Sequence, residues 1–198
     1  LGTPTSLFVR PGAAGQPDEV LACGGGWTVR RSLDGGVTWA TLNSPGGTYS
    51  SQNANGVTVG ADGSIYVAGR TSKIITTQTK IGKKVVTTTT TEYGWLVRKS
   101  TNGGANWTDA DYVVNGQPSP NLTVDTFGRI FVVGSVSGTQ ATWLVRGSID
   151  GGATWLTTDC FLPAGATASQ AWGIASDAFG NVCVIGHANA NGAASSYL

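Results

Sequence analysis

Two aspartates on one short stretch are the residues whose types and spacing come nearest to catalytic chemistry. Asp109 and Asp111 stand two residues apart in WTDADYV, and alternate residues of a β-strand point to the same face of a sheet. Carboxyl groups about 5 to 10 Å apart can act as general acid and base in a hydrolase. Carboxylates on an outer strand also discourage unwanted pairing between sheet edges. We expect Asp109 and Asp111 to share a face, and we favour the second role.

Histidine and cysteine are too few to indicate a metal centre or a disulfide framework. His187 is the only histidine, which excludes a centre with several histidine ligands, and we expect it at the end of a loop. Cys23, Cys160 and Cys183 are odd in number and have no CxxC spacing. Cys23 and Cys183 replace apolar residues of a recurring segment, so we predict two buried thiols; a disulfide between Cys160 and Cys183 is the alternative. No metal and no cofactor is predicted.

The tryptophans show how the chain is organised. Six of the seven tryptophans form three pairs, and the members of each pair are 12 residues apart. The bracketed segments read WTVRRSLDGGVTW, WLVRKSTNGGANW and WLVRGSIDGGATW. A second recurring segment reads GSIYVAG at 63–69, GRIFVVG at 128–134 and GNVCVIG at 180–186. Such self-similarity is typical of a repeat protein.

Each repeat predicts four short antiparallel strands joined by tight turns. The predicted fold class is therefore all-β, and four-stranded repeats of this length are typical of the blades of a β-propeller. We expect residues 1–198 to form a single partial propeller of about three and a half four-stranded antiparallel blades. The expected blades are 5–45, 54–115, 119–162 and an incomplete fourth at 169–198.

An insertion and an incomplete last repeat depart from the regular pattern. The insertion at 71–94, within blade two, is predicted to be an extended hairpin. It is either a solvated decoration or a rim element that contacts a ligand or a neighbouring chain. Three and a half blades leave apolar surface open at the end of the row. Either further blades of the same parent chain cover that surface, or copies of the chain associate as a homo-oligomer.

The three glycine-rich turns resemble the Asp-box, also called the bacterial neuraminidase repeat, whose pattern is Ser-x-Asp-x-Gly-x-Thr-Trp. The first and third turns match every defined position, and the second has Asn102 and Asn106 instead. The resemblance implies a propeller of the sialidase-like superfamily, in which this motif lies at the periphery, away from the ligand. It implies structural roles for the matching residues: Ser32, Asp34, Gly36, Thr38, Trp39, Ser100, Asn102, Gly104, Trp107, Ser148, Asp150, Gly152, Thr154 and Trp155.

A sialidase resemblance would further imply three arginines that bind the substrate carboxylate, a Tyr–Glu nucleophile pair and an aspartate acid/base. Arg30, Arg98 and Arg146 occupy one position in three successive repeats, which favours a repeated structural contact. Glu92 and Tyr93 are neighbours in a predicted strand and so point to opposite faces. The leading hypothesis is therefore a non-catalytic binding or scaffold module.

The alternative is a sialidase-like or other glycoside hydrolase whose catalytic residues lie partly outside this segment. It requires Arg70, Asp62, Asp125 and Asp177 to converge within about 10 Å. The binding hypothesis assigns ligand contacts to Trp172, Arg70 and Asp125. Trp172 is the one tryptophan outside the paired pattern, on a predicted innermost strand, where a propeller places its binding face.

Composition narrows the class of partner. Glycine supplies 30 of the 198 residues, charged residues make up 12%, and the net charge is +1. This excess of glycine and β-branched residues excludes a helical bundle, and the scarcity of cations disfavours nucleic acid. No apolar run approaches the ~20 residues of a membrane span. We expect a glycan or protein ligand, no nucleic acid, no membrane, and an extracellular or cell-surface location.

Overall fold

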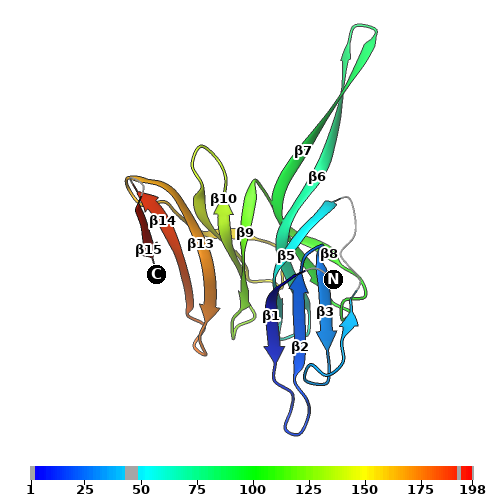
Figure 1. The fold of residues 1–198 in the computed structure, drawn as a ribbon, viewed down its shortest axis with the longest axis vertical. Helices are drawn as coiled ribbons and strands as arrows, with labels where there is room; N and C mark the ends of the chain where they lie inside the picture. The colour runs from blue at the N-terminus through cyan, green and yellow to red at the C-terminus, as the bar shows by residue number, and fades with distance from the viewer. Residues whose placement is uncertain (1–2, 43–48, 191–192, 198) are drawn as a thin grey trace.

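Four antiparallel sheets follow one another along the chain in the computed structural model, which describes residues 3–42, 49–190 and 193–197. In each sheet the strands pair in the order of the sequence (Figure 1). Sheet one contains β1 (Pro4–Arg10), β2 (Glu19–Gly24), β3 (Thr28–Ser32) and β4 (Ala40–Thr41). Sheet two contains β5 (Tyr49–Val59), β6 (Ile65–Ile81), β7 (Lys84–Ser100) and β8 (Thr108–Val114). Sheet three contains β9 (Gly116–Val124), β10 (Ile130–Val136), β11 (Thr142–Ser148) and β12 (Leu156–Phe161), and sheet four contains β13 (Ala166–Ser176), β14 (Val182–Ala190) and β15 (Ala193–Tyr197).

The prediction of an all-β protein with four-stranded antiparallel sheets is confirmed, because the described residues contain strands and no helix. The expected ends of the first repeat, at residue 45, and of the fourth, at residue 198, lie outside the described residues. None of the described segments is a helix of the length and apolarity that a membrane span requires.

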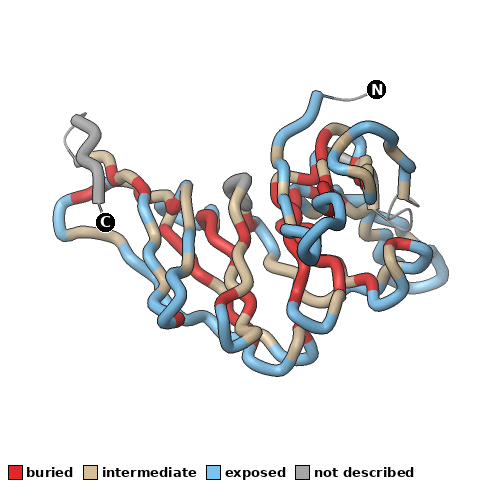
Figure 2. The backbone as a smooth tube through the Cα atoms, turned by 90° about the horizontal axis from the view of Figure 1, so that it is seen from below, coloured by how far each residue is buried: buried red, intermediate tan, exposed pale blue. Residues whose placement is uncertain are grey.

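The sheets stand side by side in a row. The first strand of each sheet contacts the first strand of the next, in the order β1, β5, β9 and β13. Sheets one and four therefore lie at opposite ends of the molecule, as the view from below shows (Figure 2). Among the described residues, the inner sheets are covered on both faces by other sheets, and each end sheet is covered on one face only.

The hydrophobic core consists of layers between neighbouring sheets. Leu21 and Val29 of sheet one pack with Val57 and Val67 of sheet two, and a second and a third layer fill the next two interfaces. The first tryptophan of each pair lies in or next to a third strand and is almost fully buried in these layers: Trp27, Trp95 and Trp143 are 2%, 0% and 4% exposed. The second and third strands of the two inner sheets are apolar on both faces because both faces meet another sheet.

Glycine is required at one position within the second strands of sheets two and four, where two backbones approach closely. A Cβ atom at Gly69 would lie 2.2 Å from the carbonyl oxygen of Asn53, and one at Gly186 would lie 2.1 Å from that of Gln170. The Cβ would also meet the rings of Trp27 and Trp143, respectively, at 2.8 and 2.6 Å. Only a residue without a side chain fits against the neighbouring strand and the tryptophan of the preceding sheet.

The residues inserted in the second repeat form the outer parts of β6 and β7, which project from the body as a two-stranded ribbon (Figure 1). The two strands keep one uninterrupted register from the pair Ile65–Ser100 to the pair Ile81–Lys84. Gly82, with φ of 62°, is the first residue of the two-residue turn at the tip, a position that favours glycine.

The prediction that Cys183 is buried is wrong, because Cys183 is exposed, whereas Cys23 is buried. Cys183 and Ile185 are two residues apart on β14 and therefore share a face, which no described sheet covers. The equivalent face of β6 is buried against sheet three through Tyr66 and Ala68. The three thiols are free, so the alternative of a disulfide between Cys160 and Cys183 is not realised in this structure.

Candidate ligand-binding site

The three glycine-rich turns are closed by the same hydrogen bonds. In the first turn, the Ser32 hydroxyl donates to Asp34 at 2.7 Å and accepts the Gly36 N–H at 2.8 Å, and the Thr38 N–H donates to Asp34 at 2.8 Å. The Trp39 indole N–H donates to the Gly36 carbonyl at 2.9 Å. The same four bonds recur in the third turn, and Asn102 accepts the equivalent bonds in the second. These polar groups are engaged within the turn itself.

The turns also attach each sheet to the one before it. The Gly151 carbonyl of sheet three accepts hydrogen bonds from Lys99 Nζ at 2.7 Å and from the Tyr66 hydroxyl at 2.9 Å, both in sheet two. Gly104 of sheet two lies so close to Leu42 of sheet one that a Cβ would meet its side chain at 2.5 Å. The turn residues thus hold neighbouring sheets together.

Acid should weaken the first and third turns more than the second. The Thr38 hydroxyl, followed by that of Ser32, lowers the pKa of Asp34 to about 2, and the Thr154 hydroxyl and amide lower the pKa of Asp150 to about 2. The stabilisation is complete above the ordinary pKa of 3.8 and is lost as the pH falls through about 2. Replacing both aspartates with asparagine, as at Asn102, should flatten the dependence of the urea unfolding midpoint on pH across this interval. Parallel profiles for the variant and the wild type would contradict this account.

The prediction that Asp109 and Asp111 share a face is wrong. Val97 lies opposite Asp111 and Arg98 lies opposite Asp109, so β8 has one extra residue, Ala110, between them. This bulge reverses the alternation. Asp109 accepts a hydrogen bond from Tyr49 at 3.0 Å and forms an ion pair with Arg98 at 2.8 Å.

Asp111 instead points toward sheet three, where it accepts two hydrogen bonds from Arg146, at 2.8 and 2.9 Å. Arg146 also donates to the carbonyl of Trp155, and Arg30 donates to that of Trp39 in the same way. These arginines contact the turn tryptophans of their own sheets. The guanidinium groups of Arg30 and Arg146 thus donate hydrogen bonds to other residues of the protein.

A bulge recurs in the first strands of three sheets. The extra residue is Thr5 in β1, Asn55 in β5 and Trp172 in β13, and it lies beside Gly24, Gly69 and Gly186, respectively, on the second strand. In β9 the register shifts at the same level, next to Asn121. Bulges redirect side chains away from the regular pleat. The first strands contact one another in order, so these residues form a row, which we call the bulge row.

Hydrogen bonds connect the bulge row from sheet to sheet. The Thr5 hydroxyl donates to the Ala54 carbonyl of sheet two at 2.5 Å, and the Asn121 amide donates to the Trp172 carbonyl of sheet four at 2.7 Å. Sequence reasoning selected Trp172 but missed Thr5, Asn55 and Asn121. The glycine that ends each recurring segment, Gly69 in GSIYVAG and Gly186 in GNVCVIG, was the available signal, because it makes room for the bulge.

Trp172 is the most prominent side chain of the bulge row. It is 52% exposed, whereas the paired tryptophans Trp27, Trp95 and Trp143 are buried. Its ring lies 4.2 Å from that of His187 on β14, at an interplanar angle of 40°. The two rings form one aromatic surface, in which Trp172 is exposed and His187 is partly buried. His187 thus lies within a strand, and the expectation of a loop-end histidine is wrong.

Arg70 occupies in sheet two the position that His187 occupies in sheet four, one residue beyond the glycine beside the bulge. Its backbone N–H donates to the side chain of Asn55 at 3.2 Å, and its guanidinium lies 5.7 Å from the centre of the Tyr93 ring. Arg70 and Asn55 in sheet two, and His187 and Trp172 in sheet four, are therefore equivalent pairs. Each pair combines a bulge residue with its neighbour on the second strand.

Asp125 lies at the opposite end of its sheet, in the turn between β9 and β10. Its carboxylate accepts the N–H groups of Phe127 and Arg129, both at 2.9 Å, and forms an ion pair with the Arg129 side chain at 2.5 Å. Asp62 and Asp177 occupy the equivalent turns of sheets two and four. Arg70 is five residues beyond the start of β6, about 16 Å from this end at ~3.3 Å per residue. The structure therefore does not bring Arg70 and the three aspartates together.

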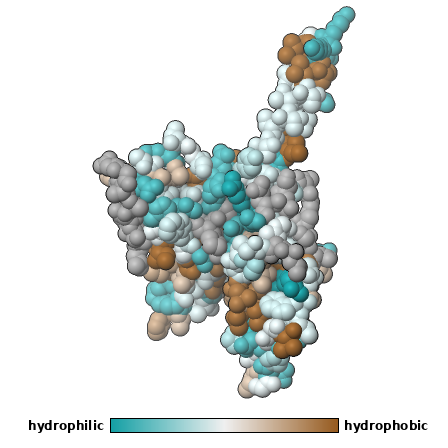
Figure 3. Space-filling model, in the orientation of Figure 1, coloured by the Kyte–Doolittle hydropathy of each residue, from teal (hydrophilic) through white to brown (hydrophobic). Residues whose placement is uncertain are grey.

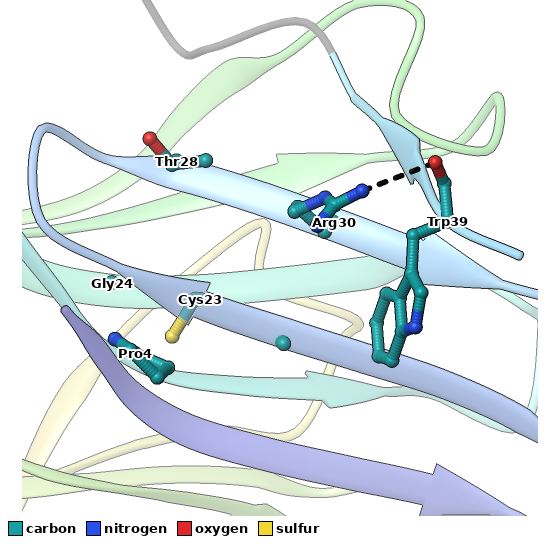
Figure 4. Close-up of a pocket in the computed structure, with 7 residues that line it drawn as sticks. Pro4, Cys23, Gly24, Thr28, Arg30 and Trp39 are labelled. Carbon is teal, nitrogen blue, oxygen red and sulfur yellow. Dashed lines mark hydrogen bonds between the residues drawn. The ribbon is translucent and has the colours of Figure 1, made fainter. Parts of the chain in front are cut away.

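A cavity of about 260 Å³ lies on sheet one, on the face turned away from sheet two. Figure 4 shows Arg30 and Trp39 at one side of it and Pro4 and Cys23 at the other. Arg30 corresponds to Arg146, whose partner Asp111 comes from the preceding sheet. Burial raises the pKa of the Cys23 thiol to about 11. No group of three or more His, Cys, Asp or Glu within the described ranges is placed to hold a metal ion.

Comparison with known proteins adds information on the fold only. No protein-family model and no curated protein matches this chain. The crystal structure of a protein of unknown function from Dyadobacter fermentans is similar over 94% of this chain, with a TM-score of 0.55 and 16% identity. A xylan β-1,4-xylosidase from Bacillus halodurans has a TM-score of 0.36, with 11% identity over 94% of this chain and 49% of its own. Trypanosoma rangeli sialidase has a TM-score of 0.33, with 12% identity over 86% of this chain and 41% of its own.

The chain spans 62% of the length of the Dyadobacter protein. At this level of identity the similarity shows a shared fold alone and carries no information about activity. The TM-scores of the two glycosidases are too low to support an inference about this chain.

Proposed function

We propose that this chain is part of a β-propeller and that it binds a glycan, without catalysis, at the bulge row. The four sheets would be successive blades, and the first strands would line the central axis, where the bulge row lies. The proposed location is outside the cell or at its surface, where such ligands are presented.

The row of sheets supports the propeller assignment. Each sheet is a meander whose first strand contacts the first strand of the next sheet, and apolar layers fill every interface between them. The cavity beside Arg30 supports the presence of a further sheet at that end. At the equivalent position of sheet three, Arg146 binds Asp111 of the preceding sheet, and a preceding sheet would fill the space beside Arg30 in the same way. Further blades of the same parent chain or a second copy of the chain would supply that sheet, and the mass of the protein in solution distinguishes the two.

The observation that carries the ligand proposal is the exposed ring of Trp172 against His187. A sugar ring has one apolar face of C–H groups and a rim of hydroxyls, so it suits an aromatic surface next to hydrogen-bonding groups. The Asn55 side chain and the Arg70 guanidinium provide such groups at the equivalent position of sheet two. We favour binding over hydrolysis because Asp111 and Asp125, two well-buried carboxylates, are both held by arginines.

Replacing Trp172 with alanine should weaken glycan binding at least about fivefold, because stacking on an aromatic ring contributes about 1 kcal/mol. The measurement is a titration of a glycan panel against the wild type, followed by calorimetry with the best ligand. Phe179→Ala is the control, since Phe179 is another exposed aromatic residue, 81% exposed, in the turn at the far end of the same sheet. Equal affinities for Trp172→Ala and the wild type would remove the bulge row from the binding site.

A further inference from the structure

The projecting part of the β6–β7 hairpin has two strands where the body has four. β5 pairs with β6 only as far as Lys73, and β8 pairs with β7 only from Gly94 onward. Between these points, residues 74–91 have no third strand among the described residues. A ribbon of two strands is only marginally stable alone, and an unpaired edge is a template for another strand.

The backbone groups that β7 turns outward can be identified from the body of the sheet. The Tyr93 carbonyl accepts the Asn115 N–H from the direction of β8. Alternate residues turn their backbone groups to the same side, and the register from Ser100 to Lys84 is uninterrupted. Val85, Thr87, Thr89 and Thr91 therefore present their N–H and C=O groups at the open edge. This open stretch is symmetrical about Thr88.

Charge distinguishes the two edges of the hairpin. From Val85 to Thr91 the β7 edge carries no charge, with Lys84 at one end and Glu92 at the other. The β6 edge carries lysines at both of its ends, Lys73 and Lys80, and no acidic residue. Antiparallel pairing of a strand with its own copy joins opposite ends. The β7 edge would then bring unlike charges together, whereas the β6 edge would bring lysines near apolar residues and gain no ion pair.

We propose that two copies of this chain associate through their β7 edges, antiparallel and with the two-fold axis at Thr88. Val85 then pairs with the partner's Thr91, and Thr87 pairs with the partner's Thr89. Lys84 lies opposite the partner's Glu92, and two ribbons become one four-stranded sheet.

The surface of the hairpin fits this arrangement. Ile81 and Val85, 64% and 54% exposed, give the far end of the ribbon an apolar surface below its hydrophilic tip (Figure 3). In the proposed register Val85 is the diagonal neighbour of the partner's Tyr93, which is 44% exposed in the single chain. In this register the tip of one ribbon reaches only as far as the last residue of β8 in the partner, so the two bodies remain apart.

The test measures mass by light scattering over a range of protein concentrations. The wild type should approach twice the mass of one chain at high concentration. Thr89→Pro should remain a monomer, because proline removes an outward N–H and leaves the bonds to β6 intact. Thr76→Pro is the matched control, since Thr76 lies directly opposite Thr89 on the β6 edge, and it should still form dimers. A monomeric wild type, or equal masses for the two variants, would overturn the proposal.

A second pair of variants does not depend on whether a proline is accommodated. Lys84→Glu should weaken dimerisation about tenfold, because a glutamate at this position of one copy then faces the partner's Glu92 at both ends of the interface. Lys83→Glu makes the same change in net charge one residue away, opposite the partner's Tyr93, and should have a smaller effect. If Lys83→Glu weakened the dimer as much as Lys84→Glu, the proposed register would be wrong.

Discussion

Gly69→Ala should lower the free energy of unfolding by about 3 kcal/mol, the upper part of the range for overpacked sites. The new Cβ would lie 2.2 Å from the Asn53 carbonyl oxygen, 2.9 Å from the Ala54 Cα and 2.8 Å from the Trp27 ring. Two of these obstacles are backbone atoms of β5, and the third is a buried ring. Relief would require β5 to move away from β6, which would also disturb the Asn55 bulge. Denaturant unfolding of the variant and the wild type measures the difference.

Gly138→Ala is the control for this change. The nearest atom to a Cβ at Gly138 is the Gln140 carbonyl oxygen at 3.7 Å, an ordinary contact, and Gly138 does not have a positive φ. Its stability should stay within about 0.5 kcal/mol of the wild type. A Gly69→Ala protein as stable as Gly138→Ala would mean that the bulge beside Gly69 is not required for the fold.

Asp111→Ala should also lower the free energy of unfolding by about 3 kcal/mol, because it leaves the Arg146 guanidinium without its carboxylate in a largely buried place. The side chains of Asp111 and Arg146 are 8% and 18% exposed, and two hydrogen bonds join them across sheets two and three. We place the effect at the low end of the range for buried pairs, since Arg146 keeps hydrogen bonds to Thr157 and Trp155. The measurement is again denaturant unfolding.

Two controls separate the ion pair from the general loss of an acidic residue. Asp159 occupies in sheet three the position of Asp111 in sheet two, opposite the third strand, but its side chain is exposed. Asp159→Ala should therefore lower the free energy of unfolding by less than about 1 kcal/mol. Combining Asp111→Leu with Arg146→Met should recover most of the lost stability, because both charges are then removed together. Equal effects of Asp111→Ala and Asp159→Ala would contradict the assignment of a contact between sheets.

Features that depend on a few neighbouring residues could be predicted well. The all-β class and the order of strands in each sheet follow from apolar segments separated by Gly and Asp turns. The three glycine-rich turns are closed by bonds within eight residues, from Ser32 to Trp39 in the first of them. Local hydrogen bonds of this kind are determined by the residue types in one short segment.

Predictions that depend on register failed. Asp109 and Asp111 were assigned to one face by the simple alternation of a strand, and the Ala110 bulge separates them. Cys183 was expected to be buried because similar positions hold apolar residues, but in sheet four no described neighbour covers that face. A bulge and a neighbouring sheet are both properties of the assembled sheets, and a periodic pattern in the chain does not contain them.

The sequence by itself determined the repeats, their strands and turns, the projecting ribbon and the choice of Trp172 as a residue outside the structural pattern. Only the tertiary structure decided that Trp172 is a bulge residue stacked on His187, that Arg70 and Asn55 form the equivalent pair, and that Asp111 binds the arginine of the next sheet. Hydrogen bonds within a turn connect residues that are close in the chain. The pairs of the bulge row and of the interfaces between sheets connect residues that are distant in the chain, from 15 positions apart for Arg70 and Asn55 to 85 for Tyr66 and Gly151. Their geometry depends on strand register and sheet packing, which form only when the whole row of sheets has assembled.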